Sequence, residues 1–343
     1  MTSQQQKRRN VRRRIFYLKR AAALGTVILL TGILALLLLS CMADKSTEPA
    51  AQKTQAGQPR PANAAMPVSR GEAPAAPTVP TVQNVPDGWK QIDLSESALR
   101  EGTLVLVNNQ IAFDDSIPET VTVYDQKDGS YLVKDIYLSV TQETMDALNE
   151  WMDAFAAETG IRDVNIVAGW RSFQDQTGLY ENAVSNRGQA YADAYIALPG
   201  HSEHHTGLAV DLDTYDVESG ASGGFDGEED YAWAVEHAWE FGFIQRYPEA
   251  KSEITGINFE SWHFRYVGLP HAYVMRSENL CLEEYIYYLR GYPFSGRHLN
   301  VTCFDNNYEI YFCPKDQVVV PSSGDYRVSG NNVDGFIVVI ELP

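Results

Sequence analysis

The chain has 343 residues, with 27 basic and 45 acidic side chains and a formal net charge of −18 at pH 7. Eight of the basic residues lie within the first twenty positions, so the rest of the chain holds 19 basic against 45 acidic residues, a net charge of −26. A body this acidic repels nucleic acid and gives no support to a phosphate-binding role. We therefore expect no nucleic-acid partner.

The N-terminus is predicted to hold the protein at a membrane. The basic stretch of residues 1–20 contains no acid and is followed by an apolar run, Ala21–Leu39, whose only polar members are two threonines. Nineteen helical residues rise about 28 Å, enough to cross the hydrocarbon core of a bilayer. A basic arm stays in the cytoplasm, which puts the C-terminal part outside. A buried core helix is disfavoured because the run has no amphipathic period.

Two versions of this segment remain open. It is either an uncleaved signal anchor or a lipoprotein signal, in which Cys41 of the sequence Leu-Leu-Ser-Cys would be lipidated and become the new N-terminus. The long apolar run favours the anchor, and the position of Cys41 favours the lipoprotein. Both versions predict a cell-membrane location, with the folded part of the chain extracytoplasmic.

A tether and a folded part follow. The stretch after Cys41 is rich in Ala, Pro, Gln and Thr, and it cannot bury enough apolar surface to offset its ordering entropy. It is therefore predicted to be a disordered, extended tether. The sequence divides into a basic arm, a membrane segment, a tether, a central folded domain and a β-rich C-terminal part: residues 1–20, 21–41, 42–86, 87–290 and 291–343.

Helix and strand patterns alternate irregularly through the central domain. The clearest helix is Ser139–Gly160, with a capping box formed by Ser139 and Gln142 and a terminal glycine. The other predicted elements, in chain order, are a strand at Thr103–Val107, a strand at Val164–Ala168, a helix capped by Ser172 and ending near Val184, a helix at Glu228–Phe241 ended by Gly242, and a strand at Trp262–Val267. The absence of a repeating β-α-β rhythm predicts an α+β fold.

After about Tyr292 the pattern changes to short strands separated by turn residues, which predicts a small C-terminal β appendage. The expected strands are Val301–Cys303, Glu309–Cys313, Gln317–Val320 and Gly335–Leu342. Cys303 and Cys313 would flank a hairpin, and an extracellular setting permits a disulfide between them, although two thiols remain an alternative. Cys281 has no evident partner and is predicted to be buried.

Two short segments hold the residues that can perform chemistry. Residues 202–211 read SEHHTGLAVD, and residues 260–265 read ESWHFR. His204, Asp211 and His263 can supply three ligands to one metal, and Glu260 can act as a base. Three protein ligands, an open position for water and a nearby carboxylate are the minimum for metal-assisted hydrolysis. Two histidines and one aspartate suit zinc best.

Written as S-x-H-x-x-G-x-A-x-D and E-x-W-H-x-R, these segments closely resemble the motifs of VanY-type zinc D-alanyl-D-alanine carboxypeptidases, which trim the peptide stems of bacterial peptidoglycan. The resemblance covers roughly residues 95–290. It implies a hedgehog/D-Ala-D-Ala peptidase-like zinc domain, a Zn²⁺ cofactor, and removal of the terminal D-Ala from stem peptides. It also assigns the metal to His204 rather than to the neighbouring His205, and leaves His201 and Glu203 around the ligands or at the rim of the substrate site.

The resemblance also suggests residues that contact the substrate. Arg171 lies in a G-W-R-S sequence directly after a predicted strand, and the family has a similar element whose arginine is thought to hold the substrate carbonyl. Arg171 is therefore predicted to stabilise the developing oxyanion. Ser202 matches the motif serine and is predicted to contact the C-terminal carboxylate, for which Gln174 and Gln176 are further candidates. Trp262 is predicted to wall the pocket.

Alternative functions share part of this chemistry. The same metal and base would serve an L,D-carboxypeptidase or an endopeptidase acting on the same wall peptides, because the motifs do not report the stereochemistry of the pocket. A non-enzymatic wall-binding protein is a third hypothesis. The presence of both Glu260 and Arg171 argues against it, since binding alone needs neither a base nor an oxyanion partner. The sequence gives no indication of oligomeric state.

Overall fold

The computed structural model describes residues 85–113 and 116–343. The predicted basic arm, the membrane segment and nearly all of the tether lie outside these residues. Within the described part, none of the helices combines the length and the apolar character that crossing a membrane would need.

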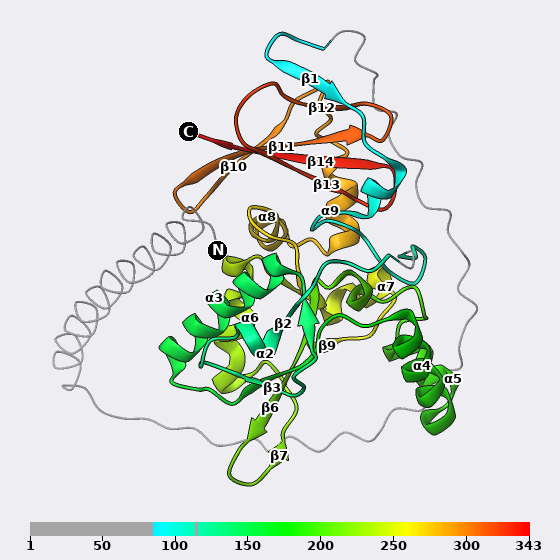
Figure 1. Ribbon diagram of the computed structural model, residues 1–343, viewed down its shortest axis with the longest axis vertical. Coiled ribbons are helices and arrows are strands. Elements are labelled where there is room, and N and C mark those ends of the chain that lie inside the picture. The colour runs from blue at the N-terminus through cyan, green and yellow to red at the C-terminus, as the bar shows by residue number, and fades with distance from the viewer. Residues whose placement is uncertain (1–84, 114–115) are drawn as a thin grey trace, which may run out of the picture. The chain divides into compact units, whose positions relative to one another are not determined.

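Helices and strands alternate irregularly along the described chain, which confirms the expected mixture of helix and sheet (Figure 1). The strands are β1 Trp89–Ile92, β2 Val121–Thr122, β3 Leu132–Val133, β4 Ser139–Val140, β5 Val164–Ala168, β6 Ala209–Asp216, β7 Ala221–Ser222, β8 Phe243–Tyr247, β9 Glu260–Tyr266, β10 Leu299–Cys303, β11 Asn306–Pro314, β12 Val318–Pro321, β13 Tyr326–Gly330 and β14 Gly335–Leu342. The α-helices are α2 Val123–Gln126, α3 Gln142–Thr159, α4 Phe173–Arg187, α5 Gln189–Tyr195, α6 Ala232–His237, α7 Ser252–Thr255, α8 His271–Glu278 and α9 Leu282–Leu289. The 3-10 helices are η1 Glu96–Arg100, η2 Glu203–Thr206, η3 Glu229–Tyr231, η4 Ala238–Phe241 and η5 Glu249–Lys251.

A mixed sheet forms the centre of the predicted catalytic domain, residues 87–290. Its strand order is β3-β5-β6-β9-β8, with β7 pairing only with β6. The β3–β5 pair is parallel and the other pairs are antiparallel. In the β6–β9 pair, Asp211 lies directly opposite His263. This register brings together two side chains that are 52 positions apart in the sequence.

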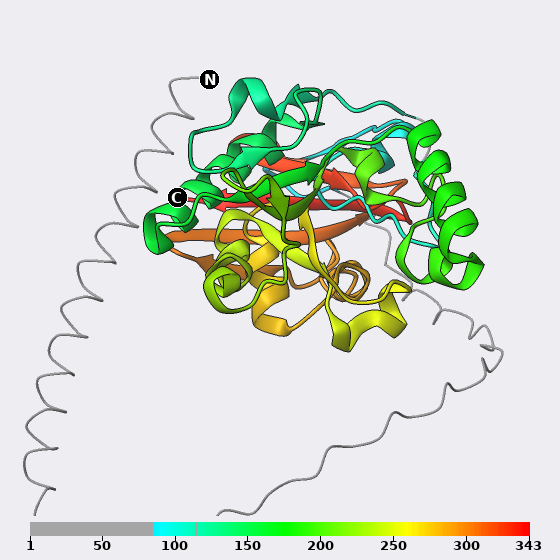
Figure 2. The same cartoon turned by 90° about the horizontal axis from the view of Figure 1, so that it is seen from below.

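Helix α3 contributes a large share of the core beside this sheet. Thr141 caps its N-terminus by accepting a hydrogen bond from the Thr144 amide, and Gly160 ends it in the left-handed conformation at φ 79°. The predicted cap at Ser139 is therefore wrong, because Ser139 pairs with β2 as part of β4. Helices α4 and α5 pack against each other on the side away from α3 (Figures 1 and 2).

Two other predicted elements differ from the structure. The helix expected at 228–241 is divided into η3, α6 and η4, and Gly242 ends it as predicted. The strand expected at 103–107 does not form. This segment is buried, and its amides bond to the C-terminal segment instead: the Leu104 amide donates to Ser329 Oγ and the Leu106 amide donates to the Asn331 carbonyl. We refer to residues 103–107 as the buried loop.

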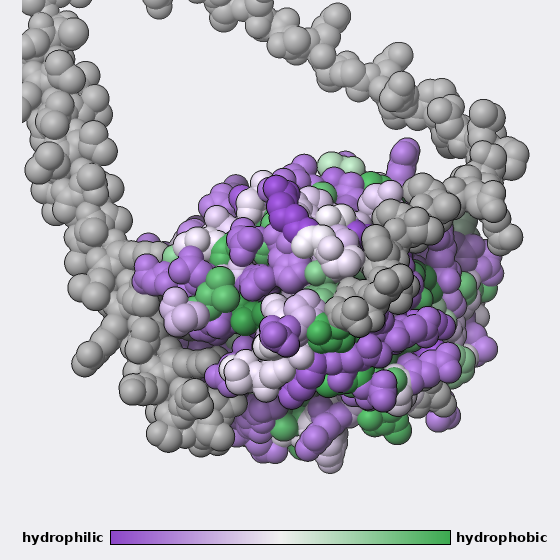
Figure 3. Space-filling model, turned by 90° about the horizontal axis from the view of Figure 1, so that it is seen from above, coloured by the Kyte–Doolittle hydropathy of each residue, from purple (hydrophilic) through white to green (hydrophobic). Residues whose placement is uncertain are grey.

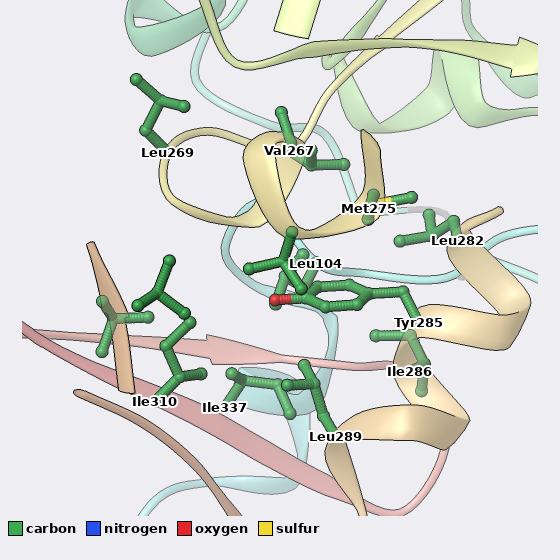
Figure 4. Packing of buried hydrophobic residues seen from close by; sticks show 14 of the residues in the cluster. Leu104, Val267, Leu269, Met275, Leu282, Tyr285, Ile286, Leu289, Ile310 and Ile337 are labelled. Atoms are coloured by element: carbon green, nitrogen blue, oxygen red, sulfur yellow. The ribbon is translucent and has the colours of Figure 1, made fainter. Parts of the chain in front are cut away.

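The C-terminal β structure shares its core with the catalytic domain. Strands β10-β11-β14-β13 form one sheet, and β12 pairs with β1, which comes from the other end of the described chain. The sequence did not predict β1 or β13. One hydrophobic cluster joins α8 and α9 to this sheet, with Leu104, Tyr285 and Ile337 among its members (Figure 4). The β-rich segment is thus packed onto the catalytic domain rather than standing apart from it.

The cysteines do not follow the disulfide hypothesis. Cys303 and Cys313 are buried in different hydrophobic clusters, and no disulfide joins them. The alternative of two thiols is the one that the structure shows, and Cys281 is buried as expected.

The face of the molecule in Figure 3 is mostly hydrophilic, with small hydrophobic areas between the polar side chains.

Trp151 of α3 generates a stability prediction. Its fully buried ring packs at 5.0 Å from the ring of Phe243 and 4.8 Å from that of Phe264, and its Nε1 donates to the Ala234 carbonyl. We expect Trp151→Ala to lower the free energy of unfolding by about 3–5 kcal/mol, through the cavity and the lost hydrogen bond. Tyr137→Ala is the control, because Tyr137 is 80% exposed, and should cost about 0.5 kcal/mol or less. Denaturant unfolding measures both values, and equal costs would contradict the packing described.

Candidate metal and active site

Three local structures place the three predicted ligands. His204 lies in the short helix η2, where Ser202 Oγ accepts a hydrogen bond from the His204 amide at 3.3 Å. Gly207 ends this helix at φ 69°, a left-handed conformation that glycine adopts without strain, and turns the chain into β6. Asp211 is the third residue of β6, and His263 lies opposite it on β9. The turn therefore folds His204 back over the β6–β9 pair.

His204, Asp211 and His263 form a compact group, with one ligand atom from each lying within 4.8 Å of the others. His204 Nε2 is 3.3 Å from Asp211 Oδ2, and His263 Nδ1 is 2.9 Å from Asp211 Oδ1. Both histidines are buried, at 4% exposure each. Two imidazole nitrogens and a carboxylate oxygen are a donor set that zinc commonly uses with an open fourth position. The residues present therefore fit the predicted metal.

The remaining nitrogen of each histidine ring has a partner outside the group. His204 Nδ1 lies 2.6 Å from the Gly169 carbonyl oxygen, to which it can only donate. His263 Nε2 lies 3.5 Å from Glu203 Oε2. These contacts leave His204 Nε2 and His263 Nδ1 as the nitrogens that face Asp211. Metal-binding histidines usually donate their second N–H to a carbonyl or carboxylate in this way, which fixes the tautomer and the ring orientation.

Burial and mutual contacts shift the pKa values of all three side chains of the group. Burial alone would raise the pKa of Asp211, but the two histidines outweigh it and hold that pKa well below its usual range. Burial lowers the pKa of His204. Burial would also lower the pKa of His263, but hydrogen bonds to Asp211 and Glu203 raise it to about 9. A cation that binds here takes the place of the proton on His263, so binding releases that proton.

Glu260 lies beside the group without belonging to it. It is the first residue of β9, is 6% exposed, and has Oε2 at 3.9 Å from His263 Nδ1. Burial raises the pKa of its carboxyl to about 7. A carboxylate with a pKa near the working pH can both accept and return a proton, which is the property required of a general base. The placement agrees with the predicted role, which remains a prediction.

Arg171 approaches the same group from the start of α4. Its Nη2 is 4.0 Å from Asp211 Oδ2, and its Nη1 donates to Gln176 Oε1 at 2.8 Å. Gln176 is itself fixed, since it is 1% exposed and donates to the Ala197 carbonyl. The sequence suggested Gln176 only as a substrate contact. In the structure it is the buried residue of the largely exposed helix α4, and it fixes the position of Arg171.

His205 has a different role from its neighbour. Its Nε2 accepts a hydrogen bond from the Gly200 amide at 3.1 Å, which makes the ring neutral with a proton on Nδ1. Nδ1 lies 2.7 Å from the carbonyl oxygen of Arg171, to which it donates. Both ring nitrogens are thus engaged with backbone groups, and the structure groups His204, not His205, with Asp211. His201 lies apart, with Nδ1 2.7 Å from the Asn108 carbonyl oxygen.

The predicted substrate contacts are placed differently from each other. Ser202 is 4% exposed and lies beside His204, where its hydroxyl accepts from the His204 amide. Trp262 is 36% exposed, while its neighbours Ser261 and His263 on β9 are buried. A small cavity adjoins Arg171, and Trp262 is not part of its wall. The cavity is lined by Phe113, Ser116, Ile117, Trp170, Arg171, Ser172, Phe173, Gly200 and His205.

Two buried arginines complete the surroundings of the site. Arg246 of β8 and Arg265 of β9 are both fully buried, and each donates to Glu203 Oε1 at 2.8 Å. Burial alone would raise the pKa of Glu203, but these two guanidiniums hold it well below its usual range. Arg265 belongs to the second motif. Arg246 lies outside both motifs, and the sequence carried no signal for it.

Several known proteins are similar to this chain in sequence. The model of the VanY family, D-alanyl-D-alanine carboxypeptidase, matches residues 137–269. A D-alanyl-D-alanine carboxypeptidase of Enterococcus faecium is 33% identical over 257 residues, which cover 72% of this chain and 78% of the relative. The bifunctional D-Ala-D-Ala dipeptidase and D-Ala-D-Ala carboxypeptidase VanXYC of Enterococcus gallinarum is 38% identical over 167 residues, covering 45% of this chain and 80% of the relative.

Similarity extends to the fold. The solved structure of the vancomycin resistance D,D-dipeptidase VanXYg, in complex with a D-Ala-D-Ala phosphinate analogue, superposes with a TM-score of 0.65 at 31% identity and covers 74% of this chain and 99% of its own. The match to the first relative spans more than three quarters of that protein, and the motif residues lie together in the structure. The chain belongs to the VanY family of D-alanyl-D-alanine carboxypeptidases.

Proposed function

We propose that this protein is a zinc-dependent D,D-carboxypeptidase that removes the terminal D-Ala from peptidoglycan stem peptides. The observation that carries the proposal is the group of His204, Asp211 and His263, whose ligand atoms lie within 4.8 Å of one another beside a buried carboxylate. Membership of the VanY family supports the choice of substrate.

Each residue of the site has a part in the proposed reaction. Zn²⁺, when bound by the three ligands, supplies the Lewis acidity that makes water nucleophilic near neutral pH and polarises the scissile carbonyl. Glu260 takes the proton of the attacking water and gives it to the leaving amine, for which a pKa near 7 is suited. Arg171 holds a fixed positive charge toward the carbonyl oxygen as it gains negative charge. Ser202 and Trp262 are proposed substrate contacts.

A second candidate activity is hydrolysis of free D-Ala-D-Ala. The relative from Enterococcus gallinarum is described as both a dipeptidase and a carboxypeptidase, and it is 38% identical to this chain over 167 residues. An L,D-carboxypeptidase or endopeptidase activity would use the same metal and base, so the products must distinguish these activities.

We further propose the location and the domain character. Residues 21–41 hold the protein at the cell membrane as an anchor or a lipidated segment, and residues 42–86 tether an extracytoplasmic catalytic domain; the sequence pattern supports this. Residues 87–290 are proposed to be a hedgehog/D-Ala-D-Ala peptidase-like zinc domain with residues 291–343 as its small β appendage. The position of the metal group on the antiparallel β6–β9 pair supports the proposed zinc domain. The appendage is attached to this domain through their shared hydrophobic core.

Digestion of defined peptides tests the proposed function. The zinc-loaded protein should release D-Ala from a stem pentapeptide, leave the tetrapeptide intact and cut no cross-link, as followed by mass spectrometry. Glu260→Gln should keep its zinc and its fold but lose about two to four orders of magnitude in kcat, because it removes acid–base assistance without removing a ligand. Cleavage of the tetrapeptide alone would replace the proposal with an L,D-carboxypeptidase, and full activity of zinc-loaded Glu260→Gln would remove Glu260 as the base.

Metal content of neighbouring histidine variants tests the ligand set. We expect His204→Ala to lose most of the zinc, because it removes one of three ligands. His205→Ala should keep close to one zinc per chain, since both nitrogens of His205 bond to backbone groups. Elemental analysis of the purified proteins measures this difference. The opposite pattern would show that the ligand assignment is displaced by one residue.

Steady-state kinetics test Arg171. If its charge acts on the developing oxyanion, Arg171→Ala should lower kcat by about two to three orders of magnitude with a smaller rise in KM. Arg171→Lys should recover only part of this loss, because lysine keeps the charge without the planar fork. A rise in KM with unchanged kcat would instead assign Arg171 to ground-state binding of the substrate.

A further inference from the structure

A buried ionic network reaches the metal group from its protein side. Glu203 is 1% exposed, and Arg246 and Arg265 are fully buried. Both guanidiniums donate to the same carboxylate oxygen, Glu203 Oε1, at 2.8 Å each. The other oxygen, Oε2, lies 3.5 Å from His263 Nε2. The two arginines therefore occupy one side of the carboxylate and leave the other side to the histidine.

We propose that Glu203 is a positioning residue that holds His263 with Nδ1 toward Asp211, and that Arg246 and Arg265 clamp Glu203 for this purpose. An imidazole can bind a metal through either nitrogen, and the hydrogen bond made by the other nitrogen decides which. The carboxylate accepts a hydrogen bond from the Nε2–H group and leaves Nδ1 to the metal. This inference concerns the zinc site of the proposed function and rests on it.

The clamp is itself anchored at two places. Arg265 Nη2 donates to the carbonyls of Thr103 and Val105 in the buried loop, at 3.0 and 2.8 Å. Arg246 forms a bidentate ion pair with Glu283 in the first turn of α9, in which Nη1 donates to Oε2 at 2.9 Å and Nη2 donates to Oε1 at 2.6 Å. Neither guanidinium can rotate without breaking these bonds. The position of Glu203 is thus set by segments that pack against the C-terminal sheet.

A purely structural ion network explains the geometry less well. Burying charged groups is costly, and apolar residues of similar volume are often as stabilising as a buried ion pair. Pairing alone would also be served by spreading the two guanidiniums over both carboxylate oxygens. Instead Oε1 accepts both, and Oε2 is directed at a ring that already faces Asp211 through Nδ1 at 2.9 Å.

Zinc affinity of matched variants tests the inference. Glu203→Gln retains the size of the side chain but removes the charge that accepts the His263 proton, and we expect its zinc dissociation constant to rise about 10- to 100-fold, measured by competition with a chelator. Glu284→Gln is the control, because it removes the neighbouring carboxylate of α9, which pairs with Lys251 and lies outside the clamp. It should lower the melting temperature while its zinc affinity stays within about threefold of wild type.

The outcomes separate the two proposals. Failure of the wild-type protein to bind zinc would overturn the proposed function. Equal zinc affinity of wild type and Glu203→Gln, or equal weakening in Glu203→Gln and Glu284→Gln, would overturn only the role of Glu203. If Glu203→Gln does not fold, Glu203→Asp takes its place under the same thresholds, because it keeps the charge for the arginines and draws the carboxylate back from His263. The absorption spectrum of the cobalt-substituted protein, which reports ligand geometry, should change only in the Glu203 variant.

Discussion

The antiparallel pairing of β6 with β9 is the constraint on which the rest of the site depends, because it sets Asp211 directly opposite His263. Side chains at opposite positions of neighbouring strands lie within contact distance. A shift of register by one residue would put the two side chains on opposite faces of the sheet. The short helix η2 then needs only one left-handed turn at Gly207 to bring His204 over the pair. A sheet register and one glycine thus position all three ligands.

Polar groups around the ligands orient the rings on this frame. The Gly169 carbonyl orients the His204 ring through Nδ1, and the Glu203 carboxylate orients the His263 ring through Nε2. Arg171 is held in turn by the buried Gln176 and by the bond from His205 to its carbonyl. Preorganised groups of this kind pay no reorganisation cost at the moment of reaction. The C-terminal sheet takes part in this order, since the buried loop bonds both to it and to Arg265.

The sequence predicted the ligand set and the base because these residues have fixed spacing within two short motifs. It placed the helix ended by Gly160 and the cap at Ser172 for a similar reason, since caps are local signals. It could not find Arg246, whose partner Glu203 lies 43 residues away. It also missed the anchoring role of Gln176, because that role depends on a bond to the Ala197 carbonyl, 21 residues further along. The failed strand at 103–107 has the same cause: its apolar pattern suits any buried segment, and its hydrogen-bond partners lie more than 200 residues further along.

One crystallographic experiment can show where the metal binds and which nitrogen of His263 holds it. Anomalous scattering from a crystal of the zinc-loaded protein, collected at the zinc absorption edge, would locate both. We expect a single strong peak bounded by His204 Nε2, the Asp211 carboxylate and His263 Nδ1, with His263 Nε2 still directed at Glu203. A peak bound to His205, or to His263 through Nε2 after the ring has turned away from Glu203, would contradict it.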